Sequence, residues 1–174
     1  MIAIGIDPGT VRTGYGVVRK DGARLTRLAS GTIQTRAKEP MEQRLRVIHE
    51  GLERVLTTYA PDEAAIEDVF FAKNAQSALK LGQVRGVILL TVAKREIPVV
   101  SYAPTFVKRS VVGTGRAAKN QVGRVVQAIL GLGELPQEDE GDALAVAICH
   151  VNAPRIPEVK TRIPRGRPKT RRRT

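Results

Sequence analysis

Residues 2–19, IAIGIDPGTVRTGYGVVR, decide the fold because they place a turn-forming sequence between two segments that favour β-structure. The apolar run over 2–6 predicts a buried strand, and the Asp-Pro-Gly sequence at 7–9 favours a turn directly after it. The first acidic residue of the chain, Asp7, therefore stands where a buried strand ends.

The next two segments extend this pattern into a small sheet. Residues 13–19 and 25–35 are both compatible with strands. We expect short connections around residues 14–16 and 20–22, which contain the glycines of this region. The three segments together predict an antiparallel meander.

The rest of the chain alternates between helical and strand patterns. Apolar residues recur at steps of three or four over 41–59, which predicts an amphipathic helix, and Pro40 suits its first turn. Together with the meander, these patterns predict an α/β fold with a mixed five-stranded sheet flanked by helices. The other expected elements are strands over 64–66 and 98–102, and helices over 74–94, within 104–115, over 119–130 and from about 136 to Pro154.

Length, charge and residue usage narrow the class of protein. The 174 residues, 42% of them hydrophobic, fit one folded domain with one core. No stretch approaches the ~18 apolar residues of a membrane span, and the N-terminus lacks the features of a secretory signal, so we expect a cytoplasmic protein. The single cysteine, Cys149, and the two histidines exclude an internal disulfide and a thiolate or imidazole zinc cluster. Any metal must therefore be held by carboxylates.

The positive charge is concentrated at the C-terminus. Residues 155–174 contain nine Lys and Arg and one Glu, so they carry +8 of the formal net charge of +12. This composition predicts a disordered basic arm over 154–174, after a folded domain over 1–153. Such an arm usually binds nucleic acid or another polyanion, although a solubilising terminus without a specific partner has the same composition.

Acidic residues stand at the ends of the most apolar segments. Asp7 follows the first strand and Glu67 follows the fourth, so adjacent strands would bring both carboxylates to one edge of the sheet. Asp139 and Asp142 are three positions apart on the last helix, which points them to the same side. If that helix packs over the sheet edge, the four acids converge, and a group of carboxylates is the ligand set that Mg²⁺ and Mn²⁺ prefer.

Each acid also has a purely structural explanation. Asp7 could initiate a turn, Glu67 could be a solvated strand end, and the two helical aspartates could complement the N-terminus of their helix. We expect the neighbouring acids Glu138 and Glu140 to be helix-terminus charges only. The set of four is harder to explain in this way than any single member.

Aromatic and basic residues follow the acids along the chain. Phe70, Phe71 and Lys73 come shortly after Glu67, and an exposed aromatic ring can stack on unpaired bases, although a phenylalanine is as often part of a core. A second basic group flanks the glycine-containing loop at 113–115 and could neutralise phosphates or serve as ordinary surface charge. Its members are Lys108, Arg109, Arg116 and Lys119.

Four motifs cover roughly residues 1–153. They are IGIDPGTVRTGYGVV at 4–18, AAIEDVFFAKNAQSALKLGQVRGV at 64–87, KRSVVGTGRAAKNQV at 108–122 and EDEGDALAVAICH at 138–150. Their order and content resemble the RuvC family of Holliday-junction resolvases, one of the groups of nucleases with an RNase H-like fold. The resemblance implies an RNase H-like sheet and cleavage of phosphodiester bonds.

The resemblance implies that Asp7, Glu67, Asp139 and Asp142 are catalytic acids that hold two divalent ions, Mg²⁺ or alternatively Mn²⁺. Asp7 would bridge the ions, Glu67 and Asp142 would each bind one, and Asp139 would support them or orient water. Lys119 would stabilise charge on the pentavalent phosphate.

The DNA-binding residues are implied in the same way. Phe70 matches the aromatic residue that acts on junction bases, and Lys108 and Lys119 match basic positions near the scissile phosphate. Lys73 and Arg116 are further candidates for DNA binding, from their place beside these motifs.

The family also implies partners. Its members act as homodimers that make paired nicks in two strands of like polarity at a four-way DNA junction, during recombination and repair. They work with a junction-recognition protein and a motor that drives branch migration. The Arg- and Pro-rich tail matches no motif of the family.

Three alternatives remain open from the sequence. The chain could be a non-cleaving junction-binding protein, but all four acids are present. It could act on another branched DNA or on RNA, because a carboxylate site recognises the phosphodiester and not the junction. An actin-like ATPase rests only on the Asp-Pro-Gly-Thr turn, and such folds need two lobes where this chain encodes one.

Overall fold

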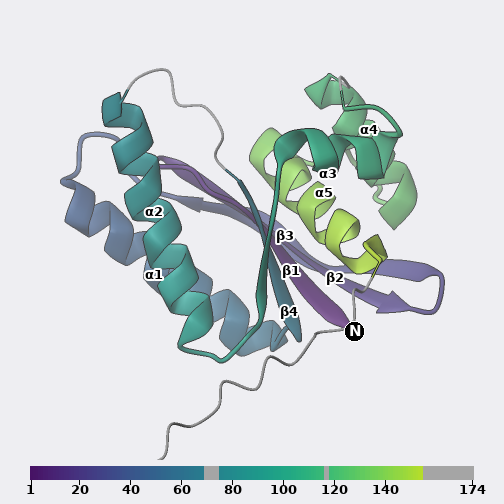
Figure 1. Ribbon diagram of the computed structural model, residues 1–174, viewed down its shortest axis with the longest axis horizontal. Helices are drawn as coiled ribbons and strands as arrows, with labels where there is room; N and C mark the ends of the chain where they lie inside the picture. The colour runs from purple at the N-terminus through teal and green to yellow at the C-terminus, as the bar shows by residue number, and fades with distance from the viewer. Residues whose placement is uncertain (69–74, 116–117, 155–174) are drawn as a thin grey trace, which may run out of the picture.

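The computed structural model of this protein describes residues 1–68, 75–115 and 118–154 (Figure 1). Five strands form one sheet, in the order β3-β2-β1-β4-β5. Among the described residues, no helix is long and apolar enough to span a membrane. The strands are β1 (Ile2–Asp7), β2 (Arg12–Asp21), β3 (Arg24–Gln34), β4 (Glu63–Glu67) and β5 (Val99–Tyr102). The helices are α1 (Met41–Tyr59), α2 (Ala75–Ala93), α3 (Pro104–Val112), α4 (Lys119–Leu130) and α5 (Glu138–Asn152).

The sheet is mixed, as the sequence predicts. β1, β2 and β3 form the antiparallel meander, while β4 pairs parallel with β1 and β5 pairs parallel with β4. One expected turn is wrong. Residues 14–16 lie inside β2, and the connection between β1 and β2 is formed by residues 8–11. The second expected turn is confirmed at Gly22, whose φ of 60° is a conformation that glycine adopts readily.

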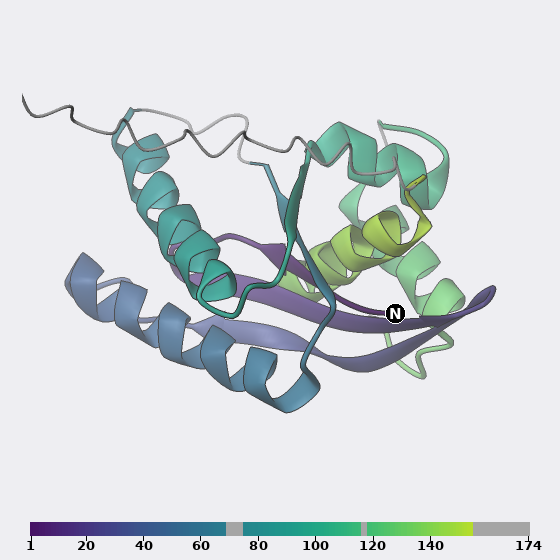
Figure 2. The ribbon, with the colours of Figure 1, turned by 60° about the horizontal axis from the view of Figure 1, so that its bottom comes forward.

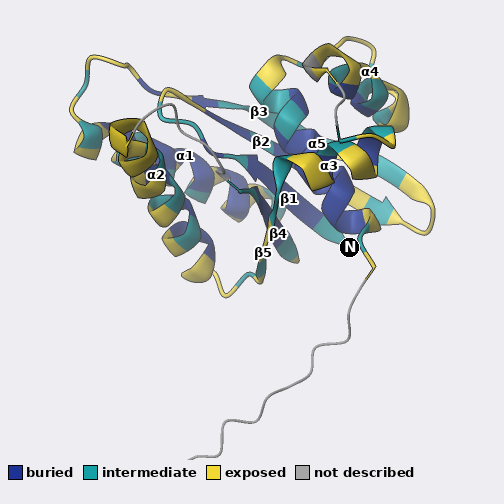
Figure 3. Ribbon diagram, turned by 45° about the horizontal axis from the view of Figure 1, so that its top comes forward, coloured by how far each residue is buried: buried dark blue, intermediate teal, exposed yellow. Residues whose placement is uncertain are grey.

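Helices cover both faces of the sheet (Figures 1 and 2). Side chains alternate along each strand, so Ile4, Ile6 and Ile66 pack with α1 and α2, whereas Val18 and Ala65 pack with the helices of the other face. That second layer consists of α3, α4 and α5. α5 is buried at Gly141 and from Ala143 to Val151, the part that Figure 3 shows in dark blue.

α5 lies unusually close to the sheet because glycines face it. A Cβ atom on Gly14 would lie 2.0 Å from the backbone oxygen of Asp139, and one on Gly5 would lie 2.2 Å from that of Ala143. Glycine is required at such a close approach of two backbones. The Gly14 and Gly16 pair, which resembles a turn in the sequence, thus serves helix docking and fixes the start of α5 over the end of β1.

Candidate active site

Two carboxylates meet at one edge of the sheet because two neighbouring parallel strands end there. Asp7 is the last residue of β1 and Glu67 is the last residue of β4, and the preceding residues Ile6 and Ile66 are register partners. The Asp7 and Glu67 side chains are hydrogen-bonded to each other. A hydrogen bond between two carboxyl groups needs a proton on one of them. The predicted meeting of these two acids is confirmed.

The start of α5 brings two more acids to the same place. Gly14 of β2 is the register partner of Asp7. The backbone of Asp139 packs directly against Gly14. Asp139 and Asp142 lie in the first turns of α5, close enough for their charges to act on Asp7. The four acids predicted from the sequence therefore converge.

The pKa of Asp7 records this crowding. Burial raises the pKa of Asp7 from its ordinary 3.8 to about 8, with further contributions from the negative charges of Glu67, Asp142 and Asp139, in that order. Desolvation and like charges both penalise the ionised form of a carboxyl group. A positive charge placed among these groups would offset the penalty.

The donor set fits a hard divalent cation, since all four groups offer carboxylate oxygens. In the described ranges of the chain, no three potential ligands already stand close enough to hold a metal ion. The other three acids are nevertheless near enough for their negative charges to act on Asp7.

Other contacts of α5 explain why the helix begins where it does. Glu140 accepts a hydrogen bond from the backbone N–H of Gln137 (3.3 Å) and one from Ser30 Oγ (2.5 Å), and it lies 3.7 Å from Arg27 Nη1. Glu140 is thus a helix-terminus charge, but the prediction that it has only this role is wrong, because it also binds Ser30 and Arg27 of β3. Asp142 lies beyond the first turn of α5, where a negative charge no longer interacts favourably with the helix dipole. Its presence is therefore not explained by a role at the helix N-terminus.

The loop after Asp7 is held by an arginine that sequence analysis missed. Arg44 of α1 is buried, and its guanidinium donates to the backbone oxygen of Thr10 (Nε at 3.0 Å) and to Thr35 Oγ1 (3.3 Å). Thr35 Oγ1 also donates to the Thr10 oxygen, at 2.8 Å. The signal was present, because Arg44 stands four positions before Ile48 on the apolar face of its helix.

A second missed arginine stabilises the end of β4. Arg85 of α2 lies 2.9 Å from Asp68 Oδ1 and donates to Ser101 Oγ at 2.8 Å. Asp68 directly follows Glu67, so this ion pair fixes the backbone beside an acid of the site. Arg12 lies on the opposite side of the site, 3.9 Å from Asp139.

The predicted DNA-binding residues are only partly within view of the structure. Lys108 lies on α3 and is partly buried. Lys119 is the first residue of α4, although its side chain lies outside the described part. Phe70, Lys73 and Arg116 also lie outside the described residues. A pocket of about 220 Å³ opens between α4 and α5, with Asp142 in its lining.

Fold and site together define the class of protein: an RNase H-like α/β domain with carboxylates gathered where β1 and β4 end and α5 begins. The family model described as Crossover junction endodeoxyribonuclease RuvC matches residues 3–150. The chain therefore belongs to the RuvC family, as the sequence motifs indicated.

Curated relatives match over most of the chain. A protein of Syntrophotalea carbinolica named Crossover junction endodeoxyribonuclease RuvC is 51% identical over 152 residues, which is 87% of this chain and 94% of that protein. A protein of the same name from Enterobacter sp. is 48% identical over 170 residues, covering 95% of this chain and 98% of its own length.

Solved structures agree with the fold. RuvC of T. thermophilus in complex with a Holliday junction substrate superposes with a TM-score of 0.82 at 36% identity, covering 87% of this chain and 93% of that one. The yeast mitochondrial Holliday junction resolvase Ydc2 superposes with a TM-score of 0.60 at 14% identity, covering 84% of this chain and 76% of that one, a likeness that concerns the fold alone.

Proposed function

We propose that this protein is a crossover junction endodeoxyribonuclease that resolves four-way DNA junctions. It nicks two strands of like polarity in a pair, during recombination and repair. The single observation that carries the proposal is the convergence of Asp7, Glu67, Asp139 and Asp142 in a chain of the RuvC family. The solved relative bound to a Holliday junction supports the choice of substrate.

The reaction depends on divalent metal ions, with two Mg²⁺ or Mn²⁺ ions in each active site. Bound between the acids, such ions would lower the pKa of the attacking water and stabilise the leaving 3′ oxygen in an in-line displacement. Asp7 lies on β1, between β4 with Glu67 and β2, against which the start of α5 packs, and the charges of all three other acids act on it, so it is suited to bridge the ions. Glu67 and Asp142 would each hold one of them, and Asp139 would support the set.

Basic residues complete the site. Lys119, at the start of α4, would stabilise negative charge on the phosphate, and Lys108 would hold the DNA strand from α3. We assign Phe70, Lys73 and Arg116 to DNA binding as well, with Phe70 acting on junction bases.

A second copy of this chain is the partner we propose for α2. Its outer face combines exposed Leu79 and Leu90 with Gly82 and Gly86, on which an added Cβ would meet nothing within 4 Å. Spacings of three and four place these residues on one stripe of the helix. Small residues between leucines let a second helix approach closely, so α2 is suited to pair with its counterpart in a homodimer.

The remaining assignments concern the whole protein. Residues 1–153 form the nuclease domain, and residues 154–174 form a basic arm that binds DNA. A junction-recognition protein and a branch-migration motor are the expected partners in the cytoplasm. The match of the family model to residues 3–150 supports this division.

A nicking assay on a synthetic four-way junction tests the proposal. Wild type, Asp7→Asn and the hairpin variant Asp21→Asn are compared with Mg²⁺, Mn²⁺ or EDTA, with linear duplex DNA and RNA as control substrates. We expect paired, metal-dependent nicks confined to the junction in wild type and Asp21→Asn, and none in Asp7→Asn. Junction binding by Asp7→Asn should persist or strengthen, because a charge that repels phosphate is removed.

Other outcomes would identify a different function. Tight junction binding without cleavage in any metal would indicate a non-cleaving binding protein. Equal cutting of duplex DNA or RNA would retain the nuclease and exclude junction specificity.

A further inference from the structure

A stacked aromatic pair joins β5 to α3. Tyr102, the last residue of β5, is the register partner of Glu67, and the backbone N–H of Asp68 donates to the Tyr102 oxygen at 2.8 Å. The Phe106 ring stacks on Tyr102, with 5.7 Å between ring centroids and 13° between planes. The pair is therefore anchored next to the strand that carries one of the four acids.

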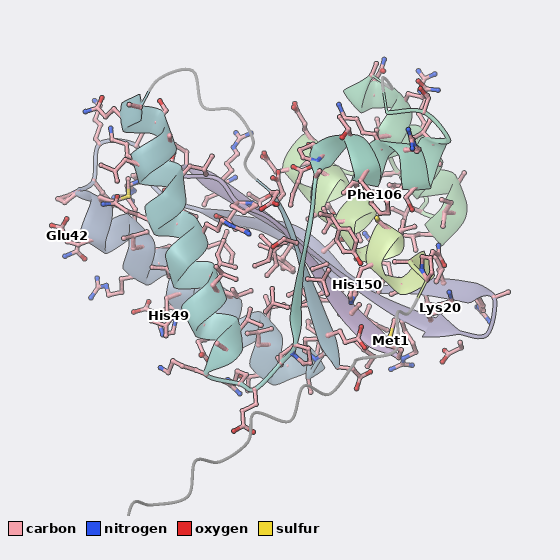
Figure 4. All side chains as sticks on the ribbon, viewed as in Figure 1. Met1, Lys20, Glu42, His49, Phe106 and His150 are labelled. Carbon is pink, nitrogen blue, oxygen red and sulfur yellow. The ribbon has the colours of Figure 1, made fainter. Side chains whose placement is uncertain are left out.

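Packing does not explain the position of Phe106. Val107 and Val111 form the buried face of α3, whereas Phe106 points away from the core and is 47% exposed. Figure 4 labels Phe106 on α3. One side of the ring is covered by Tyr102, which holds it in a fixed orientation. An exposed aromatic ring held in a fixed orientation offers a face on which a base can stack.

A groove runs past this ring. It has a volume of about 690 Å³ and is lined by Thr105, Phe106, Arg109 and residues 113–115. Phe106 and Arg109 are one turn apart on the exposed face of α3, so a flat ring and a guanidinium border the same groove.

The charge of the surrounding sequence indicates what the groove binds. Residues 97–133 contain five Lys or Arg and no Asp or Glu. Such a segment attracts a polyanion, and an aromatic face next to a cation suits a nucleic acid strand, with a base on the ring and a phosphate on the guanidinium.

We propose that Phe106 is a base-stacking platform for a DNA strand bound along α3, and that Arg109 binds a phosphate of the same strand. The inference rests on the proposed function and adds a DNA-contacting residue that the sequence motifs do not mark. Phe106 positions the strand from α3, on the far side of β5 from α2.

The absence of tryptophan from the chain provides a direct test. Phe106→Trp creates a single tryptophan reporter at the platform. Ile129→Trp is the control, because Ile129 is an apolar residue of similar exposure near the C-terminal end of α4. Each variant is titrated with a four-way junction in EDTA, so that no cleavage occurs. We expect junction binding to quench the emission of the Phe106→Trp variant by stacking and to leave that of the Ile129→Trp control nearly unchanged.

Binding constants give a second readout, from fluorescence anisotropy of a labelled junction. Phe106→Ala and Phe106→Leu should weaken binding about 5- to 100-fold, the usual effect of losing one base–aromatic stack, while Phe106→Trp should bind like wild type. Arg109→Ala should reduce the slope of log K against log salt by about 1, whereas Arg54→Ala on α1 should not change it.

The outcomes separate this inference from the proposed function. If wild type neither binds nor nicks the junction, the proposed function fails. If wild type does both, but the Phe106→Trp emission is unchanged at saturation or Phe106→Ala binds within twofold of wild type, only the platform is refuted. A change in self-association of Phe106→Ala without DNA would make the ring a protein contact and would also overturn the inference. Thermal melting of each variant identifies loss of folding, and in that case the tryptophan titration decides.

Discussion

At the scale of single residues, Asp7 is stable in the fold mainly as the neutral acid. Burial and the neighbouring carboxylates raise the pKa of Asp7 to about 8, compared with 3.8 when the chain is unfolded. Below pH 4 the Asp7 carboxyl is neutral in both the folded and the unfolded chain, so it does not lower the free energy of unfolding. As the pH rises from 4 toward 8, Asp7 ionises more readily in the unfolded chain, and the free energy of unfolding falls. Each pH unit in this window corresponds to at most about 1.4 kcal/mol.

We therefore expect Asp7→Asn to stabilise the metal-free protein in a pH-dependent way. The gain should be close to zero at pH 4 and about 1–3 kcal/mol near pH 8. Thermal melting in EDTA at both pH values measures it, with Asp21→Asn as the control. A stability difference that is the same at pH 4 and pH 8 would contradict the electrostatic explanation.

Arg44 illustrates a residue that acts through the backbone of the site. Its guanidinium is buried and donates to the Thr10 oxygen, three residues after Asp7. Arg44→Ala removes the guanidinium donors and leaves only the Thr35 hydroxyl as a donor to the Thr10 oxygen, so it should lower the free energy of unfolding by about 1–3 kcal/mol. The exposed Arg54→Ala, on the same helix, should change it by less than about 0.5 kcal/mol. Urea unfolding compares the two, and equal stabilities would argue against the hydrogen bonds as the anchor of the loop.

At the scale of elements, the active site depends on how closely α5 approaches the sheet. Gly14→Ala would place a Cβ 2.0 Å from the Asp139 oxygen, so helix and sheet must separate. We expect a loss of stability of about 1–3 kcal/mol or more and a large drop in nicking, because Asp139 and Asp142 move away from Asp7. Gly133→Ala, where an added Cβ meets nothing within 4 Å, is the matched control. Nicking by Gly14→Ala at the wild-type rate would show that this contact does not position the acids.

The same contact explains which elements the sequence could predict. The helix over 41–59 and the helix over 119–130 have the predicted bounds, because their apolar spacing is a local property. The prediction of a turn at Gly14 and Gly16 is wrong. Glycine is needed at these positions because α5, more than 120 residues further along the chain, packs directly against them. Of the site, the strand-end acids could be predicted. The position of Arg44 on the apolar face of its helix marks it as unusual, but no sequence pattern identifies the Thr10 carbonyl as its partner.

At the scale of the whole molecule, the proposed homodimer depends on the exposed stripe of α2. Leu90 is 62% exposed, and replacing it with glutamate would place a charge in the proposed helix–helix contact. Leu90→Glu should shift the protein from dimer to monomer in sedimentation experiments and remove paired nicking. Ile129→Glu, on α4, should leave the dimer intact. A dimer that persists in Leu90→Glu at micromolar concentration would assign the interface to another surface.

The distribution of charge over the molecule leads to the last prediction. Residues 155–174 carry +8 of the net charge of +12, so removing them lowers the charge of the protein to about a third. If the arm binds DNA, each lost phosphate contact reduces the slope of log K against log salt by about 0.9. Anisotropy titrations at several salt concentrations should show a slope that is shallower by several contacts in the truncated protein.

Catalysis distinguishes this role of the arm from a structural one. The acids of the site all lie within residues 1–153, so the truncated protein should still nick a junction that is present at saturating concentration. The arm would then raise the rate of encounter with DNA, which long-range attraction governs, without affecting the chemical step. An unchanged salt slope would mean that the arm does not touch the DNA, and a loss of nicking at saturation would mean that it takes part in the site.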